Sequence, residues 1–536
     1  MVTKYNQQLG SMSSPVFYML CWLCVLVMSG CSTLPPRPDV PLQSFRDHVS
    51  RDSTLAQLID PLKELNPELT GYHLLDDPLE ALAARLRLID KAEKTLDLQY
   101  YIWENDNIGA LALHGLINAA DRGVKVRLLI DDHNAKSLEG IYLALDQHEN
   151  IDVRLYNPFG FRQFRAMDFL LDLKRVNRRM HNKSFIADHQ IALIGGRNMS
   201  NQYFHSSDQY QFSDVDIILV GAATEEISDS FDEYWNDEYA YPVRGLVNAQ
   251  KHQLRYPSLK AQLNAHYQKV SVQNYLDLTH RSQDFDHWLH HDIRFSWVKA
   301  TVLKDPPGKI RNESPKEEYL NSQLLGHLEP PKTHLDIVSA YFIPEKKGAE
   351  TLSRLSKDGV QVRVLTNSYR ATDVPVVHAF YMPYREALLQ NNVHLYEFLA
   401  TPESTYLNPS NRELASKAKI NFKALSRSSL HTKLMAIDHQ QVFVGSFNFD
   451  PRSAYLNTEI GVLLDSPQLA SAIHLTMDQD LRKYTYELML DDRQKVRWKF
   501  QRHNGETEIY PHEPDMKWWQ KLGLTVFSWL PIEGYM

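Results

Sequence analysis

Two short segments of the chain carry side chains that could do chemistry together. Each has the pattern His-x-Lys-x4-Asp, followed by a Gly and an Asn at matched spacing; the residues are His181, Lys183, Asp188, Gly195 and Asn198 in the first segment and His431, Lys433, Asp438, Gly445 and Asn448 in the second. Both motifs lie in apolar, strand-like sequence, and residues i and i+2 of a strand point to the same face. We therefore expect each histidine to project beside its lysine.

Such a set of side chains suits covalent catalysis on a phosphodiester. Of two imidazoles with a reference pKa of about 6.5, one can attack and the other can protonate the leaving group. Ammonium groups and side-chain amides can hold the non-bridging phosphate oxygens. We expect phosphate binding by Lys183, Lys433, Asn198 and Asn448. Because these donors would replace a metal ion, we expect neither a metal nor a cofactor.

The two motifs belong to two copies of one domain. Three pairs of segments match in the same order: 95–101 with 335–341, 122–131 with 358–367, and 181–188 with 431–438. Their offsets are too long for a solenoid repeat and indicate one duplicated domain. In each copy an apolar β-branched run, a helical stretch ending in Gly and a second apolar run follow one another. This order is typical of an α/β fold with a parallel sheet and crossover helices.

The paired motifs are identified as the HKD motifs of the phospholipase D superfamily. Within it the chain resembles bacterial cardiolipin synthases, particularly the C type, in residues 96–103, 178–188, 364–379, 445–453 and 456–461. The resemblance implies two phospholipase D-like domains, each a mixed, mostly parallel sheet flanked by helices. It also implies a single active site at the interface between the two domains.

The reaction that the resemblance implies is phosphatidyl transfer between two phospholipids to make cardiolipin. His181 would attack phosphorus and form a phosphohistidine, and His431 would protonate the leaving alcohol and then deprotonate the incoming one. With water as the acceptor, the same residues would make a hydrolytic phospholipase D. A nuclease is a third possibility, because some HKD proteins cut DNA.

The resemblance assigns further roles to four acidic residues. The spacing in the family points to Asp216 and Glu459 as the groups that orient the two imidazoles. Asp188 and Asp438 complete the catalytic motifs, but we expect them to brace the fold rather than touch the substrate.

The first residues of the chain read as a targeting signal. Residues 16–28 contain no charge, and they are fewer than the ~20 apolar residues that a membrane-spanning helix needs. The run ends in Met-Ser-Gly before Cys31, which resembles a bacterial lipobox, and Ser32 suggests sorting to the outer membrane. We expect a signal peptide at 1–30 and a lipoprotein of the cell envelope that is anchored in the outer membrane and faces the periplasm. An ordinary signal peptide or an uncleaved anchor is the alternative.

The remaining boundaries follow from the repeat. We expect a tether and N-terminal segment at 31–75, a first domain at 76–245, a bridging segment at 246–333, a second domain at 334–500 and a tail at 501–536. The tail contains the aromatic stretch 517–530, which could pack on the core or lie in a bilayer surface.

Composition limits the partners. The hydrophobic fraction of 43 % and the charged fraction of 23 % are those of a globular protein, and the formal charge of −8 argues against nucleic acid. The expected partners are phospholipids, with phosphatidylglycerol or phosphatidylethanolamine as the candidates, and a membrane, held through lipidated Cys31 and the tail. All three cysteines lie in the first 31 residues, so no disulfide holds the fold. One chain carries both motifs, so we expect a monomer to contain a complete site.

Overall fold

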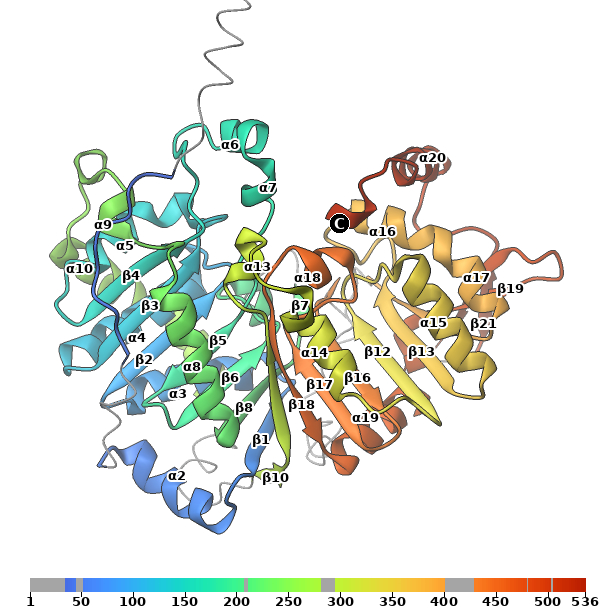
Figure 1. Cartoon of the computed structure of the whole chain (residues 1–536), viewed down its shortest axis with the longest axis horizontal. Coiled ribbons are helices and arrows are strands. Elements are labelled where there is room, and N and C mark those ends of the chain that lie inside the picture. The colour runs from blue at the N-terminus through green and yellow to red at the C-terminus, as the bar shows by residue number, and fades with distance from the viewer. Residues whose placement is uncertain are drawn as a thin grey trace, which may run out of the picture.

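The computed structural model describes residues 34–44, 52–206, 211–280, 295–400, 429–479, 481–502 and 505–536. Within them the chain forms two α/β halves that stand side by side, each built on one large sheet with helices on both of its faces (Figure 1). The expected signal peptide and Cys31 lie outside the described residues.

The first half is built on a nine-stranded sheet with the order β10-β1-β8-β6-β5-β2-β3-β4-β9. Its strands are β1 (Thr70–Leu75), β2 (Thr95–Tyr100), β3 (Lys125–Asp131), β4 (Ile151–Tyr156), β5 (Ser184–Ala187), β6 (Ile191–Gly195), β8 (Asp216–Gly221), β9 (Ala240–Pro242) and β10 (Ser296–Val298). Its helices are α2 (Thr54–Leu65), α3 (Pro78–Lys91), α4 (Asn107–Asp121), α5 (Glu139–Leu145), α6 (Ala166–Leu171), α7 (Leu173–Val176), α8 (Ala222–Asn236), α9 (Val243–Leu246), α10 (Tyr256–Tyr267) and α11 (Val270–His280).

The second half is built on a ten-stranded sheet with the order β11-β18-β17-β16-β12-β13-β14-β19-β20-β21. Its strands are β11 (Ala300–Lys304), β12 (His334–Ser339), β13 (Gln361–Asn367), β14 (His394–Phe398), β16 (Lys433–Ile437), β17 (Gln441–Gly445), β18 (Ile460–Asp465), β19 (Thr485–Leu490), β20 (Val496–Gln501) and β21 (Thr507–Tyr510). Its helices are α13 (Gly308–Arg311), α14 (Leu320–His327), α15 (Glu345–Lys357), α16 (Pro375–Tyr381), α17 (Arg385–Gln390), α18 (Pro451–Tyr455), α19 (Pro467–Gln479) and α20 (Trp518–Ser528).

The six central strands of the two sheets follow the same order, which confirms the predicted duplication. The run β8-β6-β5-β2-β3-β4 in the first half corresponds to β18-β17-β16-β12-β13-β14 in the second. Pairing is parallel only within β2-β3-β4 and within β12-β13-β14, while the other pairs in both sheets are antiparallel. The sheets are therefore mixed, as expected, but they are less parallel than the strand–helix–strand pattern predicted. That pattern covers only the three parallel strands, and the HKD strands enter as hairpins.

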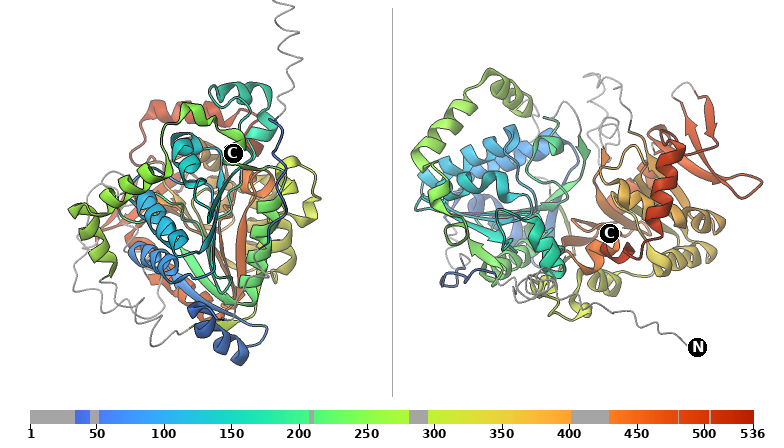
Figure 2. Two further views of the ribbon diagram at one scale, coloured as in Figure 1. Left: turned by 90° about the vertical axis from the view of Figure 1, so that its left-hand side faces the viewer. Right: turned by 90° about the horizontal axis from the view of Figure 1, so that it is seen from above.

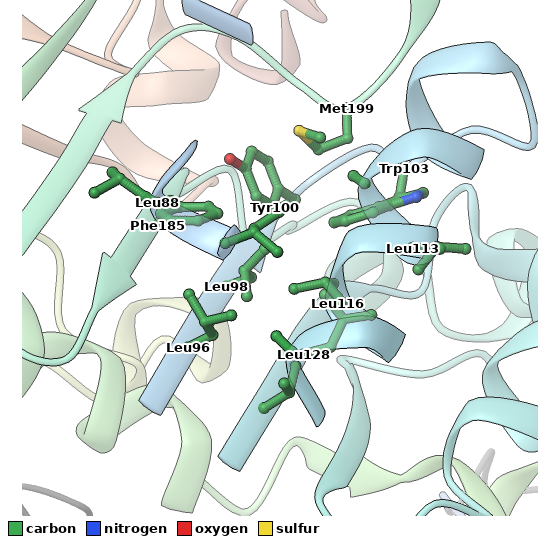
Figure 3. Packing of buried hydrophobic residues seen from close by; sticks show 14 of the residues in the cluster. Leu88, Leu96, Leu98, Tyr100, Trp103, Leu113, Leu116, Leu128, Phe185 and Met199 are labelled. Atoms are coloured by element: carbon green, nitrogen blue, oxygen red, sulfur yellow. The ribbon is translucent and has the colours of Figure 1, made fainter. Parts of the chain in front are cut away.

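Strand β2 shows how the sequence positions these elements. Leu96, Leu98 and Tyr100 point into the hydrophobic core, where they pack among side chains of α4 and β3 (Figure 3). Asp97, on the opposite face, accepts hydrogen bonds from Arg127 Nε and Nη2 at 2.6 and 2.7 Å. Alternation of this kind fixes the register, because a slip of one residue would bury the carboxylate in the apolar layer.

The second half contains the same buried ion pair. Arg363 Nε and Nη2 donate to the Asp336 carboxylate at 2.6 and 2.7 Å, on the strands that correspond to β3 and β2. Buried charges of this kind are tolerated only when they are paired in good geometry. Both copies of the domain therefore retain the buried Asp–Arg pair on one face of the sheet as well as the apolar side chains on the other.

The two sheets share one apolar cluster between them. Ile194 and Ile217 of the first sheet and Val444 and Val462 of the second belong to the same group of buried side chains. Burial of such side chains contributes roughly 1.5–3 kcal/mol each. The halves are thus held against each other by a continuous hydrophobic core, and the ends of their strands meet.

The limits of the two halves differ from the predicted boundaries. Strand β1 already belongs to the first sheet, and β21 still belongs to the second. Of the predicted bridging segment 246–333, α10 and α11 pack on α4 and α3 of the first half. The chain passes from the first sheet to the second between β10 and β11, at Lys299.

Among the residues that the structure describes, no helix is both long enough and apolar enough to cross a membrane.

Candidate active site

The residue before each HKD histidine is held by a side chain at the end of a parallel strand. Met180 N donates to Asp131 Oδ2 at 2.9 Å, and Asp131 is the last residue of β3. In the second half Leu430 N donates to Asn367 Oδ1 at 3.0 Å, at the end of β13. The residue before each histidine is therefore anchored at the carboxyl end of the parallel strands.

A second set of backbone hydrogen bonds joins each histidine to the opposite half. His181 N donates to Thr458 O at 2.9 Å, and His431 N donates to Ser213 O at 2.7 Å. The second contact continues the short parallel pairing of β15 (Ser429–Leu430) with β7 (Phe212–Ser213). The residues that immediately follow these two acceptors carry carboxylates.

These carboxylates cross the interface and hold the imidazoles. His181 Nδ1 lies 2.9 and 2.8 Å from the two oxygens of Glu459, and His431 Nδ1 lies 2.5 Å from Asp214 Oδ2. All four residues are buried. Since a carboxylate can only accept, Nδ1–H is the donor in both contacts, which leaves the lone pair of each histidine on Nε2.

The prediction that Asp216 orients a histidine is wrong. Its carboxylate instead forms an ion pair with Arg85, at 2.7 Å, and accepts from Arg197 N at 3.3 Å. Asp216 is the first residue of β8 and lies opposite Gly195. Side chains at this position point into the first half, away from the opposite motif.

The duplication explains why Asp214 takes this role. Gly195 pairs with Asp216, and the corresponding Gly445 pairs with Gly461. Counting back two residues from each partner gives Asp214 in one half and Glu459 in the other. The signal was therefore present in the sequence, but reading it requires the strand register, which a single sequence does not supply.

Two adjacent glycines make room for these acids. A Cβ on Gly196 would lie 2.2 Å from Asp214 Oδ1, and a Cβ on Gly195 would lie 2.2 Å from Asp216 Oδ1. Both distances are far shorter than atoms can approach. The corresponding position in the second half is Ser446, whose hydroxyl contacts Glu459 Oε2 at 2.5 Å.

The motif lysines lie beside the histidines as predicted from the i, i+2 spacing. Lys183 Nζ donates to His181 O at 2.6 Å, and Lys433 Nζ lies 3.0 Å from His431 Nδ1. Burial lowers the pKa of Lys183 to about 7, although the nearby Glu459 opposes this. Burial also lowers the pKa of Lys433.

Both lysines lower the pKa of each histidine. Burial, Lys183 and Lys433 together hold the pKa of His181 well below its usual value. Burial and the same two lysines do the same for His431. The ammonium group of the opposite half therefore contributes to the low pKa of each imidazole. At neutral pH the site without a ligand favours neutral imidazoles.

Burial acts in the opposite direction on the carboxylates. It raises the pKa of Glu459 to about 7, against the attraction of Lys183. Burial likewise raises the pKa of Asp214, against the attraction of Lys433. Strongly shifted ionisable groups gathered in one place are typical of a functional site.

The motif aspartates contact neither histidine. Asp188 accepts from the backbone N–H groups of Glu93, Lys94 and Thr95, at distances of 2.8–3.2 Å. Asp438 accepts from those of Lys332, Thr333 and His334, at 2.6–2.9 Å. Both carboxylates thus fix the loop that enters the first parallel strand, so they brace the fold and have no place among the reacting groups.

The two motif asparagines differ in their surroundings. Asn198 Oδ1 accepts from Ile102 N at 3.1 Å, and its Nδ2 donates to Tyr203 Oη at 2.9 Å. Asn448 Oδ1 is buried with no hydrogen-bond partner among the described residues. The amide of Asn198 is largely engaged by the protein, whereas that of Asn448 retains an unused acceptor.

Aromatic side chains, which the sequence did not single out, enclose the imidazoles. The Tyr101 ring lies edge-on to His181 at 5.0 Å, and Lys183 Nζ lies 5.6 Å from the centre of the same ring. Tyr203 and Phe212 lie 5.2 and 5.1 Å from His431. Their burial helps to lower the pKa values of the histidines. In the part of the chain that the structure covers, no three His, Cys, Asp or Glu side chains are arranged to hold a metal ion.

Comparison with known proteins shows the family to which the chain belongs. The family described as "Cardiolipin synthase, PLD-like domain" matches residues 86–235 and 324–481, one segment in each half. Cardiolipin synthase C of Escherichia coli (strain K12) is 36 % identical over 480 residues, which is 89 % of this chain and 99 % of the relative. The chain belongs to the cardiolipin synthase family with phospholipase D-like domains.

Other relatives are more distant. An uncharacterised protein of Helicobacter pylori (strain ATCC 700392 / 26695) is 31 % identical over 90 % of this chain and 92 % of its own length. A cardiolipin synthase of Oceanobacillus iheyensis is 23 % identical over 77 % of this chain and 69 % of its own length. Both matches span more than one half, so the duplicated arrangement is common to this family and to the present chain.

Asparagine substitutions at Asp214 and at Asp216 test the corrected assignment. We expect Asp214→Asn to lower kcat for phosphodiester turnover on the order of 100-fold or more, because the amide no longer fixes the His431 tautomer. Asp216→Asn is the matched control: it should lower the melting temperature, since Arg85 loses its partner, while kcat changes less than about threefold in the folded fraction. Equal kcat losses in both variants would contradict the assignment.

Anion binding should depend on pH through Lys183. Sulfate keeps its charge at neutral and alkaline pH, so the loss of the Lys183 ammonium above pH about 7 should weaken binding, by up to about tenfold per pH unit. Lys183→Arg keeps the positive charge and should make this dependence shallower. Isothermal titration calorimetry measures both; identical pH profiles would show that Lys183 does not titrate in this range.

Proposed function

We propose that this protein is a cardiolipin synthase that transfers a phosphatidyl group from one phospholipid to another through a phosphohistidine. The observation that carries the proposal is the pair of buried histidines whose Nδ1 atoms are each fixed by a carboxylate of the opposite half. Two such imidazoles present two Nε2 atoms to one space, which suits one nucleophile and one acid/base.

In the first step His181 Nε2 attacks the phosphorus of the donor lipid. The bond from phosphorus to the headgroup oxygen breaks, and His431 gives its Nε2 proton to that oxygen, so that the headgroup alcohol leaves. The product is a phosphatidyl group bound to His181. Glu459 stabilises the imidazole of His181 as its positive charge develops.

In the second step the hydroxyl of the acceptor lipid attacks the same phosphorus. His431 Nε2, now neutral, takes the proton of this hydroxyl, and the bond from phosphorus to His181 breaks. The acceptor leaves as cardiolipin and both histidines return to their first state. With phosphatidylglycerol as donor and acceptor, the alcohol released in the first step is glycerol.

The low histidine pKa values favour attack and oppose acid catalysis. A neutral His181 is ready to attack at neutral pH. His431 must carry a proton in the first step, and the negative charge of the bound phosphodiester favours its protonated form. Lys183, Lys433 and Asn448 would hold the non-bridging oxygens. The contacts of Asn198 give it a smaller part, through the remaining hydrogen of its amide.

Lipid product analysis tests the proposal. The purified protein is incubated with vesicles of phosphatidylglycerol and phosphatidylethanolamine, and the lipids are read by mass spectrometry. We expect cardiolipin with the wild type and none with His181→Ala or His431→Ala, because each variant lacks one of the two required imidazoles. The co-product, glycerol or ethanolamine, identifies the donor.

Two results would change the assignment. Phosphatidic acid without cardiolipin would make the protein a hydrolytic phospholipase D with the same residues. Near-normal activity in either histidine variant would contradict the shared site. A phosphoenzyme that accumulates in His431→Ala but never forms in His181→Ala would identify His181 as the nucleophile.

We further propose that the protein is a lipoprotein of the outer membrane, facing the periplasm, anchored through Cys31. The support is the lipobox-like sequence alone, and it lies outside the described residues. We expect metabolic labelling with a radioactive fatty acid to mark the wild type and not Cys31→Ala. Labelling of both proteins would exclude acylation at this residue.

A further inference from the structure

Two elements of the surface each expose several large apolar side chains. The segment 159–176, which contains α6 and α7, exposes Phe161, Phe164 and Leu170; α20 exposes Trp518, Leu522 and Trp529. Phe164 and Leu170 are each 73 % exposed, and Trp518 and Trp529 are 77 and 76 % exposed. Single exposed apolar residues are common, but groups of large ones mark interaction surfaces.

The two elements come from different halves but face the same way. In Figure 1 α6 and α7 project at the upper end of the first half and α20 at the upper end of the second, whereas α2 lies at the opposite end. The left view of Figure 2 shows the same arrangement. The two elements therefore lie at one end of the molecule, on either side of the interface.

An unbroken series of rings leads from α6 to the active site. Phe169 on α6 lies 5.8 Å from Phe159, Phe159 lies 6.3 Å from His133, and His133 lies 5.9 Å from Tyr101. Tyr101 in turn contacts His181 at 5.0 Å. The exposed face of α6 is thus four ring contacts from the nucleophile.

Helix α20 has a similar relation to the second half. Phe527 on its inner face packs on Phe380 of α16 at 6.0 Å. Ile532 and Met536, which follow the helix, pack in the same apolar group as Tyr341. Tyr341 lies two residues after Ser339, the last residue of β12, and Ser339 pairs with the motif residue Lys433.

Arg452, in α18 after the second HKD motif, joins the two elements. Its side chain donates to Asn177 Oδ1 and O, at 2.9 and 2.8 Å, at the end of α7. Its backbone N donates to Met536 O at 2.7 Å, and its side chain donates to Tyr535 O at 3.2 Å. One residue of α18 therefore contacts both the end of α7 and the segment after α20.

We propose that the segment 159–176 and α20 form a single membrane-docking surface that seats the mouth of the active site on a phospholipid bilayer. This surface is called the docking face below. The inference rests on the proposed function, which requires lipid substrates. It identifies the surface that contacts the bilayer in which these lipids lie.

The chemistry of the docking face fits a bilayer. On α20 the exposed Trp518, Leu522 and Val526 recur every four residues and form one apolar stripe, beside the exposed Lys517 and Lys521. Tryptophan and lysine together are typical of helices that lie at the membrane–water interface and contact anionic lipids.

The start of the described chain agrees with this orientation. In Figure 1 the segment 34–44 begins at the same end of the molecule as α6. Cys31 precedes it by three residues, which span at most about 10 Å of extended chain. The proposed lipid anchor and the docking face would therefore meet the same bilayer.

Bromolipid quenching tests the docking face without using enzyme activity. The full chain carrying Phe164→Trp is added to preformed vesicles of phosphatidylglycerol and brominated phosphatidylcholine. Leu65→Trp, at a site on α2 that is 78 % exposed, is the matched control. We expect the bromines to quench at least half of the fluorescence that the tryptophan at 164 adds and little of that added at 65. Equal quenching at both sites would overturn the proposal.

A turnover assay separates docking from chemistry. We expect Phe164→Ser/Leu170→Ser and Trp518→Ser/Trp529→Ser each to lower cardiolipin formation on vesicles about tenfold or more, with less than a twofold change on soluble short-chain phosphatidylglycerol. Leu65→Ser should change neither rate. Equal losses on both substrates would overturn the proposal, and so would a change of oligomeric state in the variants, because the surface would then bind protein.

These results remain distinct from a failure of the proposed function. Quenching at residue 164 in a protein that makes no cardiolipin would keep the docking face and reject the activity. Cardiolipin synthesis without this quenching would keep the activity and reject the docking face.

Discussion

The structure depends on a pair of carboxylates that reach across the interface between the two halves. Glu459 of the second half holds His181 of the first, and Asp214 of the first half holds His431 of the second. Neither histidine has its orienting acid in its own half. Buried carboxylates and imidazoles are costly unless each is paired. The pairing therefore requires the halves to be docked, and the apolar cluster shared by the two sheets supplies the free energy that docks them.

Duplication gave this site two-fold symmetry, and the chemistry needs its two histidines to differ. The backbone contacts are equivalent: the residue before each histidine is anchored at the end of a parallel strand, and the histidine N–H reaches the opposite half. The side chains around them are not equivalent. Asn198 is engaged by Ile102 and Tyr203, whereas Asn448 Oδ1 has no partner among the described residues. The proposed division of the two imidazoles into a nucleophile and an acid/base agrees with such differences.

Burial tunes every group in the site. It lowers the pKa of the histidines and lysines and raises that of the carboxylates, while each opposite charge offsets part of the shift. A phosphodiester brings one more negative charge into this space. We infer that the site is held near electrical balance without a substrate and that the substrate itself promotes protonation of His431. Tyr101, Tyr203 and Phe212 surround the two histidines with apolar rings. The electrostatic interactions among the buried groups are therefore stronger than they would be at the protein surface.

The sequence by itself determined the motifs, the duplication, the strand–helix–strand unit of each half and the position of each histidine beside its lysine, because these depend on local periodicity and on a repeat that can be counted. It also indicated that Asp188 and Asp438 brace the fold. Only the tertiary structure decided between Asp214 and Asp216, because only the register against Gly195 and the packing of the two halves show that Asp214 meets His431 and Asp216 meets Arg85. The antiparallel pairs and the position of Arg452 between Asn177 and Met536 likewise join residues far apart in the chain. Such contacts leave no periodic signal in a single sequence, since they arise when the two halves pack together.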